Sequence, residues 1–510
     1  MLARAHTFTI EGLHTRRVTV EVDIRPGLPC FTIVGLADAA VREARERVQA
    51  AIRNAGYEFP ARRITANLAP GDVPKAGPGL DLALACAVLA AGRQLSPERL
   101  AGHALFGELA LDGAVRPVRG ALAVAQATRR AGLGTLVIAG SCGWEARLVE
   151  GIDVVAVEHL RSAVRVLNGG PGDRCRAPAA APEDADAGDA AGPDLGDVRG
   201  QQHAVTALLI AAAGGHNSLF SGPPGTGKTM LAHRIGSILP PLSRREAIEV
   251  ARIRSLMGEP VRGLSGSRPF RAPHHSITTA GLIGGAQRGW IGEVVLAHNG
   301  VLFLDELSEF ARATLEALRQ PLEEGRVAIS RARHSAVYPA RFMLLAATNP
   351  CPCGFAGDGD RCRCSEADMA RHRRRLSGPL LDRIDLLVNL QREHVGDLGA
   401  GPSTTSAEAR ERVMRAREIQ GTRLAPDGVS LNAQMDARLL GRHARLEERG
   451  CGMMRRAREQ GLLSARGEHR VLRVARTIAD LDGSRRVRAR DLGTALALRP
   501  EAAFTGSRAA

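Results

Sequence analysis

The sequence predicts a mixed α/β protein whose central region is a parallel sheet flanked by helices. Three apolar runs of strand length, at residues 218–220, 301–304 and 342–346, alternate with helical patterns. Alternation of this kind is typical of parallel sheets with helices on both faces. An α+β region precedes this core and a helical region follows it, so several domains are expected in the 510 residues.

Residues 1–168 are predicted to form the α+β domain. Short alternating stretches occur between residues 7 and 23, and helical patterns cover residues 38–55 and 81–91. Residues 169–197 consist mostly of Ala, Asp, Gly and Pro and contain almost no large apolar side chain. We therefore expect a flexible linker between the first domain and the central one.

The chain carries a formal net charge of +15. A field of this sign favours a polyanionic partner such as DNA, although arginine-rich codon usage would give the same charge. No apolar run approaches the roughly 20 residues of a membrane-spanning helix, and the first residues lack the apolar core of a signal peptide. A cytoplasmic protein that does not enter a membrane is expected.

The most specific motif is a loop rich in glycine and proline, placed between a predicted strand and a predicted helix. Backbone N–H groups of such a loop converge on the β- and γ-phosphates of a nucleotide. Lys228 adds a positive charge, and the Thr229 hydroxyl is a ligand for Mg²⁺. We therefore expect bound ATP with Mg²⁺. The loop consists of Gly222, Pro223, Pro224, Gly225, Thr226, Gly227, Lys228 and Thr229.

Two carboxylates follow the second strand run, about 80 residues after the phosphate loop. Asp305 is expected to hold Mg²⁺ through its waters, and Glu306 to polarise the attacking water as a general base. Asn349 follows the third strand run and is the candidate sensor of the γ-phosphate. Arg383 lies in a loop from which its guanidinium is expected to reach the γ-phosphate of a neighbouring subunit.

These elements, in this order, resemble the AAA+ ATPases. Three strings are similar to the magnesium-chelatase branch and, within it, to the ComM/YifB family: residues 271–275, 297–306 and 377–386. The resemblance runs over about residues 1–500. It implies an AAA+ P-loop core of magnesium-chelatase type over residues 198–400 and a helical lid over residues 401–510.

The resemblance also implies a ring, expected to be a hexamer, with ATP held between subunits. Arg466 matches the family's second sensor; Arg470 or an ordinary solvated arginine are the alternatives. The implied activity is ATP-driven DNA translocation or branch migration, in natural transformation or recombination. A magnesium-chelatase motor subunit and a non-motor ATP-dependent switch or scaffold are the alternative functions.

The N-terminal domain resembles the proteolytic domain of Lon-type proteases, but both members of its catalytic dyad are replaced. Gly79 occupies the position of the serine and Leu122 that of the lysine. A serine–lysine dyad needs an attacking hydroxyl and an amine that accepts its proton. We expect a scaffold or a substrate-contacting domain rather than a peptidase.

Four of the nine cysteines lie within residues 351–364, an insertion after the candidate sensor. Two Cys-x-Cys pairs, eight residues apart, can place four thiolates around one Zn²⁺. A loop of reduced thiols is the alternative. The four residues are Cys351, Cys353, Cys362 and Cys364.

Residues 327–338 predict a hairpin with basic residues near its turn. In related ring motors such a hairpin enters the central channel, so Arg331 and Arg333 are candidates for contacts with a DNA backbone. An exposed polar turn is the alternative. Residues 371–375 are denser in arginine, but such a run is usually a solvated face, and its proximity to Arg383 suits subunit contacts as readily as DNA. His274 and His275 are expected to serve positioning or packing rather than metal binding.

Overall fold

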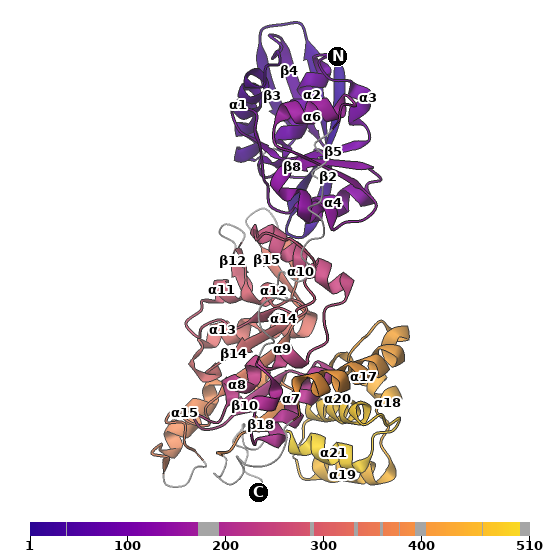
Figure 1. Ribbon diagram of the computed structural model, residues 1–510. Coiled ribbons are helices and arrows are strands. Elements are labelled where there is room, and N and C mark those ends of the chain that lie inside the picture. Colours follow the sequence, from indigo (N-terminus) through magenta and orange to yellow (C-terminus); the bar gives the residue numbers. More distant parts are fainter. Residues whose placement is uncertain are drawn as a thin grey trace. The chain divides into compact units, whose positions relative to one another are not determined.

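A computed structural model describes residues 1–36, 38–171, 193–285, 290–330, 335–356, 361–376, 378–392, 404–461 and 463–499. The chain divides into two compact units (Figure 1). The first comprises Met1–Gly188 and Arg244–Ser265, and the second comprises Asp189–Ser243 and Gly266–Ala510.

The first unit is built on a mixed seven-stranded sheet with the order β3-β4-β2-β1-β5-β8-β9. β1 and β4 pair antiparallel with β2, whereas β5, β8 and β9 run parallel to one another. The strands are β1 (Leu2–Glu11), β2 (His14–Arg25), β3 (Cys30–Val34), β4 (Arg63–Ala69), β5 (His103–Phe106), β8 (Thr135–Ala139) and β9 (Asp153–Val157). A small hairpin joins β6 (Glu108–Leu109) to β7 (Val115–Arg116).

Helices complete this unit and confirm the predicted α+β class. α1 (Ala39–Asn54) and α2 (Asp81–Ala91) lie where the sequence predicts helices. α2 is buried along its whole length, as expected for a helix that is apolar on every side. Its one carboxylate, Asp81, pairs with Arg47 at 2.8 Å. The other helices here are α3 (Pro97–Leu100), α4 (Ala121–Arg130), α5 (Gly143–Arg147) and α6 (Leu160–Leu167).

The helix α10 (Arg244–Met257) also belongs to the first unit, although the residues on both sides of its segment belong to the second. Its Ser255 hydroxyl donates to the Glu145 carboxylate of α5, and the Ser255 carbonyl accepts from the Gly120 N–H at 3.3 Å. Arg244–Ser265, which lies within the predicted core range of 198–400, therefore packs with the first unit. An amphipathic pattern shows that a helix packs against a core, but not which core.

The second unit contains a five-stranded sheet with the order β11-β14-β17-β10-β18, all parallel, which confirms the predicted class. The three predicted runs are β10 (Ser218–Ser221), β14 (Val301–Leu304) and β17 (Met343–Thr348). Two short strands were not predicted: β11 (Phe270–Arg271) at one edge and β18 (Leu386–Asn389) at the other.

Helices and two hairpins surround this sheet. The helices are α7 (Gln202–Gly214), α8 (Lys228–His233), α9 (Ile235–Ile238), α11 (Thr279–Ile283), α12 (Glu293–Leu296), α13 (Arg312–Ala317), α14 (Arg319–Glu324), α15 (Glu366–Arg375) and α16 (Gly378–Leu381). β12 (Gly284–Gly285) pairs with β13 (Trp290–Ile291). The hairpin predicted over residues 327–338 is present as β15 (Arg326–Ser330) and β16 (Ser335–Pro339).

The C-terminal helices gather beside the sheet, as the orange and yellow ribbons of Figure 1 show. A buried polar chain joins them to it: His216 lies 3.1 Å from the Asp385 carboxylate and 2.8 Å from the Thr477 hydroxyl. The helices are α17 (Ser406–Leu424), α18 (Ala437–His443), α19 (Glu448–Glu459), α20 (Ala465–Leu481) and α21 (Ala489–Ala497). Within the described parts of the chain, no helix has the length and apolar character to cross a membrane.

The predicted linker ends earlier than residue 197. Leu195 is fully buried in the core of the second unit, and its N–H donates to the Ser406 hydroxyl at 2.7 Å. Residues 172–192 of the predicted linker lie outside the described residues.

Candidate nucleotide site

The register of the parallel strands brings the predicted site residues together at the carboxyl ends of the strands. Ser221, the last residue of β10, is paired with Thr348, the last residue of β17. Leu304 of β14 is paired with Ala346 of the same central strand. The phosphate loop, the two carboxylates and Asn349 follow directly after these strand ends, and therefore lie close together.

The phosphate loop surrounds the side chain of Lys228. Gly225 and Gly227 have φ values of +81° and +84°, a region that glycine enters without a steric cost. The Lys228 ammonium donates to the Gly222 carbonyl at 2.6 Å and to the Asn349 side-chain oxygen at 3.3 Å. Burial lowers the pKa of Lys228, while the nearby acidic groups act in the opposite direction.

The residues predicted to hold Mg²⁺ contact each other directly. The Thr229 hydroxyl donates to Asp305 Oδ2 at 2.7 Å, and the other oxygen of that carboxylate accepts from the Glu306 N–H at 2.9 Å. A hydroxyl and a carboxylate are the hard oxygen donors that Mg²⁺ prefers. The donor set therefore fits Mg²⁺, with the exposed Glu306 side chain beside it.

His275 contacts the predicted general base, a contact that the sequence did not predict. Its Nδ1 lies 3.4 Å from Glu306 Oε2, and its ring centroid lies 4.0 Å from that of His274. The two residues meet because β11, which precedes the histidines, pairs with β14, which precedes Glu306. A strand as short as β11 leaves no periodic signal in the sequence.

Replacing His275 with alanine should lower kcat for ATP hydrolysis by about tenfold, equivalent to one hydrogen bond to a charged group of about 1.5 kcal/mol. The reason is that Glu306 would lose the ring that restricts its carboxylate. His274→Ala is the matched control, because the described hydrogen bonds of the His274 ring are with Ser276. Steady-state ATPase kinetics on both variants provide the measurement. Equal effects of the two substitutions would contradict the positioning role.

Arg383 is held away from the phosphate loop of its own chain. Its guanidinium forms an ion pair with Glu323 of α14 and donates to the Pro379 carbonyl at 2.6 Å. The side chain is only 15% exposed. The described partners of its guanidinium are Pro379 of α16 and Glu323 of α14, so none of the described contacts of the guanidinium is with Lys228.

The two candidates for the second sensor differ in exposure. Arg466, at the start of α20, is 69% exposed, with its guanidinium 3.9 Å from the Asp382 carboxylate. Arg470 is 10% exposed, and burial lowers its pKa to about 10. The ion pairs described for both arginines are to acidic residues near Arg383. Arg331 and Arg333, the candidate DNA contacts, lie outside the described residues.

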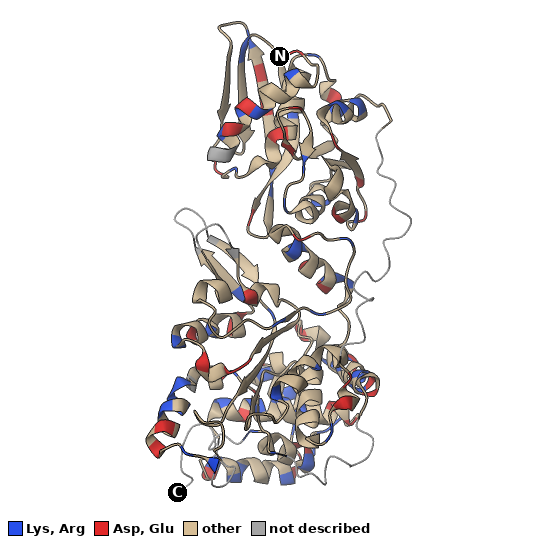
Figure 2. Cartoon of the chain, turned by 60° about the vertical axis from the view of Figure 1, so that its left-hand side comes forward, with Lys and Arg blue, Asp and Glu red and all other residues tan. Residues whose placement is uncertain are grey.

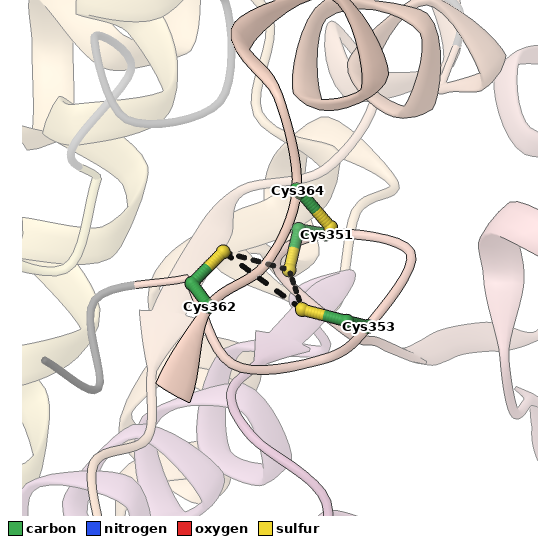
Figure 3. A group of neighbouring side chains, drawn as sticks. All are labelled: Cys351, Cys353, Cys362 and Cys364. Carbon is green, nitrogen blue, oxygen red and sulfur yellow. Dashed lines mark hydrogen bonds between the residues drawn. The ribbon is translucent and has the colours of Figure 1, made fainter. Parts of the chain in front are cut away.

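The structure brings the four clustered cysteines together (Figure 3). Their sulfur atoms all lie within 4.8 Å of one another. Cys351 Sγ lies 3.4 Å from that of Cys353 and 3.9 Å from that of Cys362. Four sulfurs at about 2.3 Å from a tetrahedral Zn²⁺ are about 3.8 Å apart, so the donor set fits zinc. An N–H group also points at a sulfur, from Ala356 to Cys351 at 3.2 Å.

The replaced dyad positions of the first unit lie in tight packing. A Cβ atom on Gly79 would lie 2.4 Å from the ring of Phe106, so a serine there requires that ring to move. The Leu122 side chain is fully buried in the core of the unit. A serine at position 79 would collide with Phe106, and a lysine at position 122 would place its ammonium in an apolar core.

A phosphate loop, a strand-end carboxylate pair and an asparagine at one edge of a parallel sheet define a P-loop NTPase. Three family models match the chain: "Magnesium chelatase, subunit ChlI" over residues 194–398, "Subunit ChlI of Mg-chelatase" over 20–141, and "Magnesium chelatase, subunit ChlI C-terminal" over 403–499. The class is therefore the magnesium-chelatase type of AAA+ protein.

Curated relatives match nearly the whole chain. YifB of Escherichia coli is 44% identical, covering 95% of this chain and 94% of its own length. An uncharacterized protein of Mycobacterium tuberculosis is 44% identical, with coverage of 94% and 95%. The competence protein ComM of Haemophilus influenzae is 42% identical, with coverage of 98% and 97%. The chain belongs to the ComM/YifB family, and this membership implies ATPase activity with Mg²⁺.

Proposed function

We propose that this protein is a cytoplasmic motor that couples ATP hydrolysis to movement on DNA, by branch migration during transformation or recombination. The observation that carries the proposal is the assembled site itself, with Lys228, Thr229, Asp305, Glu306 and Asn349 at one edge of the sheet. The similarity to a competence protein supports the choice of DNA as the substrate of the movement.

The proposal gives each of these side chains a role in hydrolysis. The loop N–H groups and Lys228 bind the β- and γ-phosphates, and Thr229 with Asp305 holds Mg²⁺, which neutralises developing charge when bound. Glu306 accepts the proton of a water whose oxygen attacks the γ-phosphorus. The bond from the γ-phosphorus to the bridging oxygen breaks, and ADP leaves. Asn349 orients the γ-phosphate through its side-chain amide.

The proposal includes a ring of subunits, expected to be a hexamer. The site of one chain holds no arginine at the phosphate loop among its described contacts, because Arg383 and Arg466 are directed to other partners. A neighbouring subunit in a ring can supply Arg383 to the γ-phosphate as a fixed cation. ATP would then be held between subunits.

Charge and the hairpin support a DNA partner. Figure 2 shows basic and acidic residues interspersed over both units, and the chain as a whole has a formal net charge of +15. The candidates Arg331 and Arg333 lie in the sequence between β15 and β16, the two strands of the described hairpin. Pairing of arginines with phosphates releases counterions and is weakened by salt.

The DNA proposal is tested by ATPase rates measured with branched and with single-stranded DNA, together with DNA retention across a salt series. We expect stimulation that falls as salt rises, because each phosphate contact contributes a slope of about −0.7 to −0.9 in log K against log salt. Absence of both stimulation and retention at low salt would contradict the proposal.

Replacing Arg331 and Arg333 together with alanine should lower the ratio of DNA-stimulated to DNA-free ATPase rate by about tenfold. The salt dependence of DNA binding should also become less steep, since two phosphate contacts are lost. Arg455 and Arg456, both exposed on α19, form a matched control pair for the loss of two positive charges. Equal losses in the two double variants would point to net charge rather than to the hairpin.

A magnesium-chelatase motor subunit is the second candidate, favoured by the names of the matching family models. Insertion of Mg²⁺ into a tetrapyrrole, followed by absorbance in the presence of chelatase partner subunits, separates it from a DNA motor. The DNA proposal predicts no insertion and no effect of tetrapyrrole on the ATPase rate.

The proposal also includes Zn²⁺ as a resident metal at the four clustered cysteines. The fit of their sulfur distances to a tetrahedral ion supports it, as does the N–H directed at Cys351. A filled structural site of four thiolates has no open position for chemistry, so its role would be to stabilise local structure.

A further inference from the structure

The segment that carries the first cysteine pair packs directly against the phosphate loop. Gly354 follows Cys353 at a φ of +84°, in a turn closed by its N–H to the Cys351 carbonyl at 2.9 Å. A Cβ atom on Gly354 would lie only 2.7 Å from Cδ of Pro224, and 3.8 Å from Cγ of Asn349. The backbone of the cysteine segment therefore contacts both the phosphate loop and the candidate sensor.

The segment after the second cysteine pair returns to the same sensor. Cys364 is followed by Ser365, which caps α15 with a reciprocal pair of hydrogen bonds to Asp368. One helical turn after Asp368, the Nε2 atom of the buried His372 lies 2.9 Å from the Asn349 carbonyl oxygen. The chain thus leaves Asn349, passes both cysteine pairs and returns to it.

A metal held by both pairs would fix the two arms of this excursion to each other. Structural zinc sites contribute folding free energy, because the four ligands are brought together only in the folded state. Without the ion, four thiol groups remain in place of a cross-link, and the arms can separate. The backbone at Gly354 would then no longer pack against Pro224.

We infer that Zn²⁺ at Cys351, Cys353, Cys362 and Cys364 braces the phosphate loop and Asn349, so that loss of the metal weakens nucleotide binding. The inference rests on the zinc of the proposed function, and it extends that role from local stability to the ATP site. It assigns the cysteine segment a positioning role, since no sulfur touches the nucleotide loop directly among the described contacts.

The test is performed on the full chain in the absence of DNA, so that its result is independent of the DNA proposal. Metal content is measured by mass spectrometry, and affinity is measured with a fluorescent ATP analogue before and after zinc removal by a thiol-reactive mercurial with a chelator. If the loop is competent about a tenth of the time without zinc, the apparent Kd rises about tenfold. Removal of the mercurial with excess thiol and addition of zinc should restore the affinity.

Two variants, with a third as control, distinguish the effect of the metal from that of the contact between Gly354 and Pro224. Cys353→Ser should lose zinc and bind the analogue about tenfold more weakly, whereas Cys451→Ser, an exposed cysteine of α19, should retain both properties. Gly354→Ala should retain zinc and still weaken binding, because its methyl group would collide with Pro224. Purified protein without zinc would overturn the metal site. Unchanged affinity for the ATP analogue after zinc removal would overturn the bracing role of the metal. This result would not depend on whether DNA stimulates the ATPase.

Discussion

Replacing Glu306 with glutamine is expected to lower kcat for ATP hydrolysis by about 10²- to 10⁴-fold, the usual contribution of a general base. ATP binding should persist, because Lys228 keeps its contact with the Gly222 carbonyl and Thr229 keeps its contact with Asp305. Glutamine has nearly the shape of glutamate but cannot take the proton of the attacking water. Single-turnover hydrolysis and equilibrium binding of ATP, measured on the same preparation, separate the two effects.

Glu309→Gln is a suitable control for this substitution. Glu309 lies three residues along the same segment and pairs with Arg375 at 3.3 Å, away from the Thr229–Asp305 pair. Its replacement should leave the hydrolysis rate within about twofold, as expected for an exposed ion pair. Wild-type rates in Glu306→Gln would refute the assigned base. Retained biological activity with hydrolysis abolished would favour an ATP-dependent switch over a motor.

Replacing Arg383 with alanine is expected to lower kcat by about 10³- to 10⁵-fold if the arginine completes the site of a neighbouring subunit. A mixing experiment tests the sharing directly, with Lys228→Ala as the second inactive variant. An Arg383→Ala subunit keeps an intact phosphate loop, and a Lys228→Ala subunit keeps Arg383. An interface that combines this loop with this arginine is therefore complete. Random mixing in equal amounts makes about one quarter of interfaces complete, so activity should reappear in the mixture.

Glu323→Gln is the control for the arginine variant, since it removes the ion pair of Arg383 while leaving the guanidinium. Rates near those of the wild type are expected, because Arg383 would be released from α14 rather than lost. A mixture that stays as inactive as its two components, while both variants still assemble into rings, would show that Arg383 does not act between subunits.

The sheet and the hydrolysis site were predictable from the sequence for the same reason. Apolar runs of three to five residues identify buried strands, and parallel strands end on the same side of the sheet, so residues directly after β10, β14 and β17 must meet. His275 was not predictable as a partner of Glu306, because β11 is too short to leave a period. The ion pair of Arg383 with Glu323 depends on how α14 packs against the loop, which local sequence does not encode.

The domain boundaries could be predicted from the sequence only in part. The composition of residues 169–197 indicated a linker, yet Leu195 is a core residue of the second unit, since one leucine among small and polar residues is enough to anchor a segment. The placement of α10 was unpredictable because its apolar side suits either unit equally well in sequence.

The two-part composition of the first unit has a consequence for making fragments of this protein. A fragment that starts near residue 193 would contain α10 without α4 and α5, its partners in the first unit. The buried side of α10, including Ala247, Val250 and Ile253, would face solvent and promote aggregation. A fragment that stops at residue 188 would lack the helix altogether. A soluble ATPase fragment would need a short glycine-rich bridge from Ser243 to Gly266.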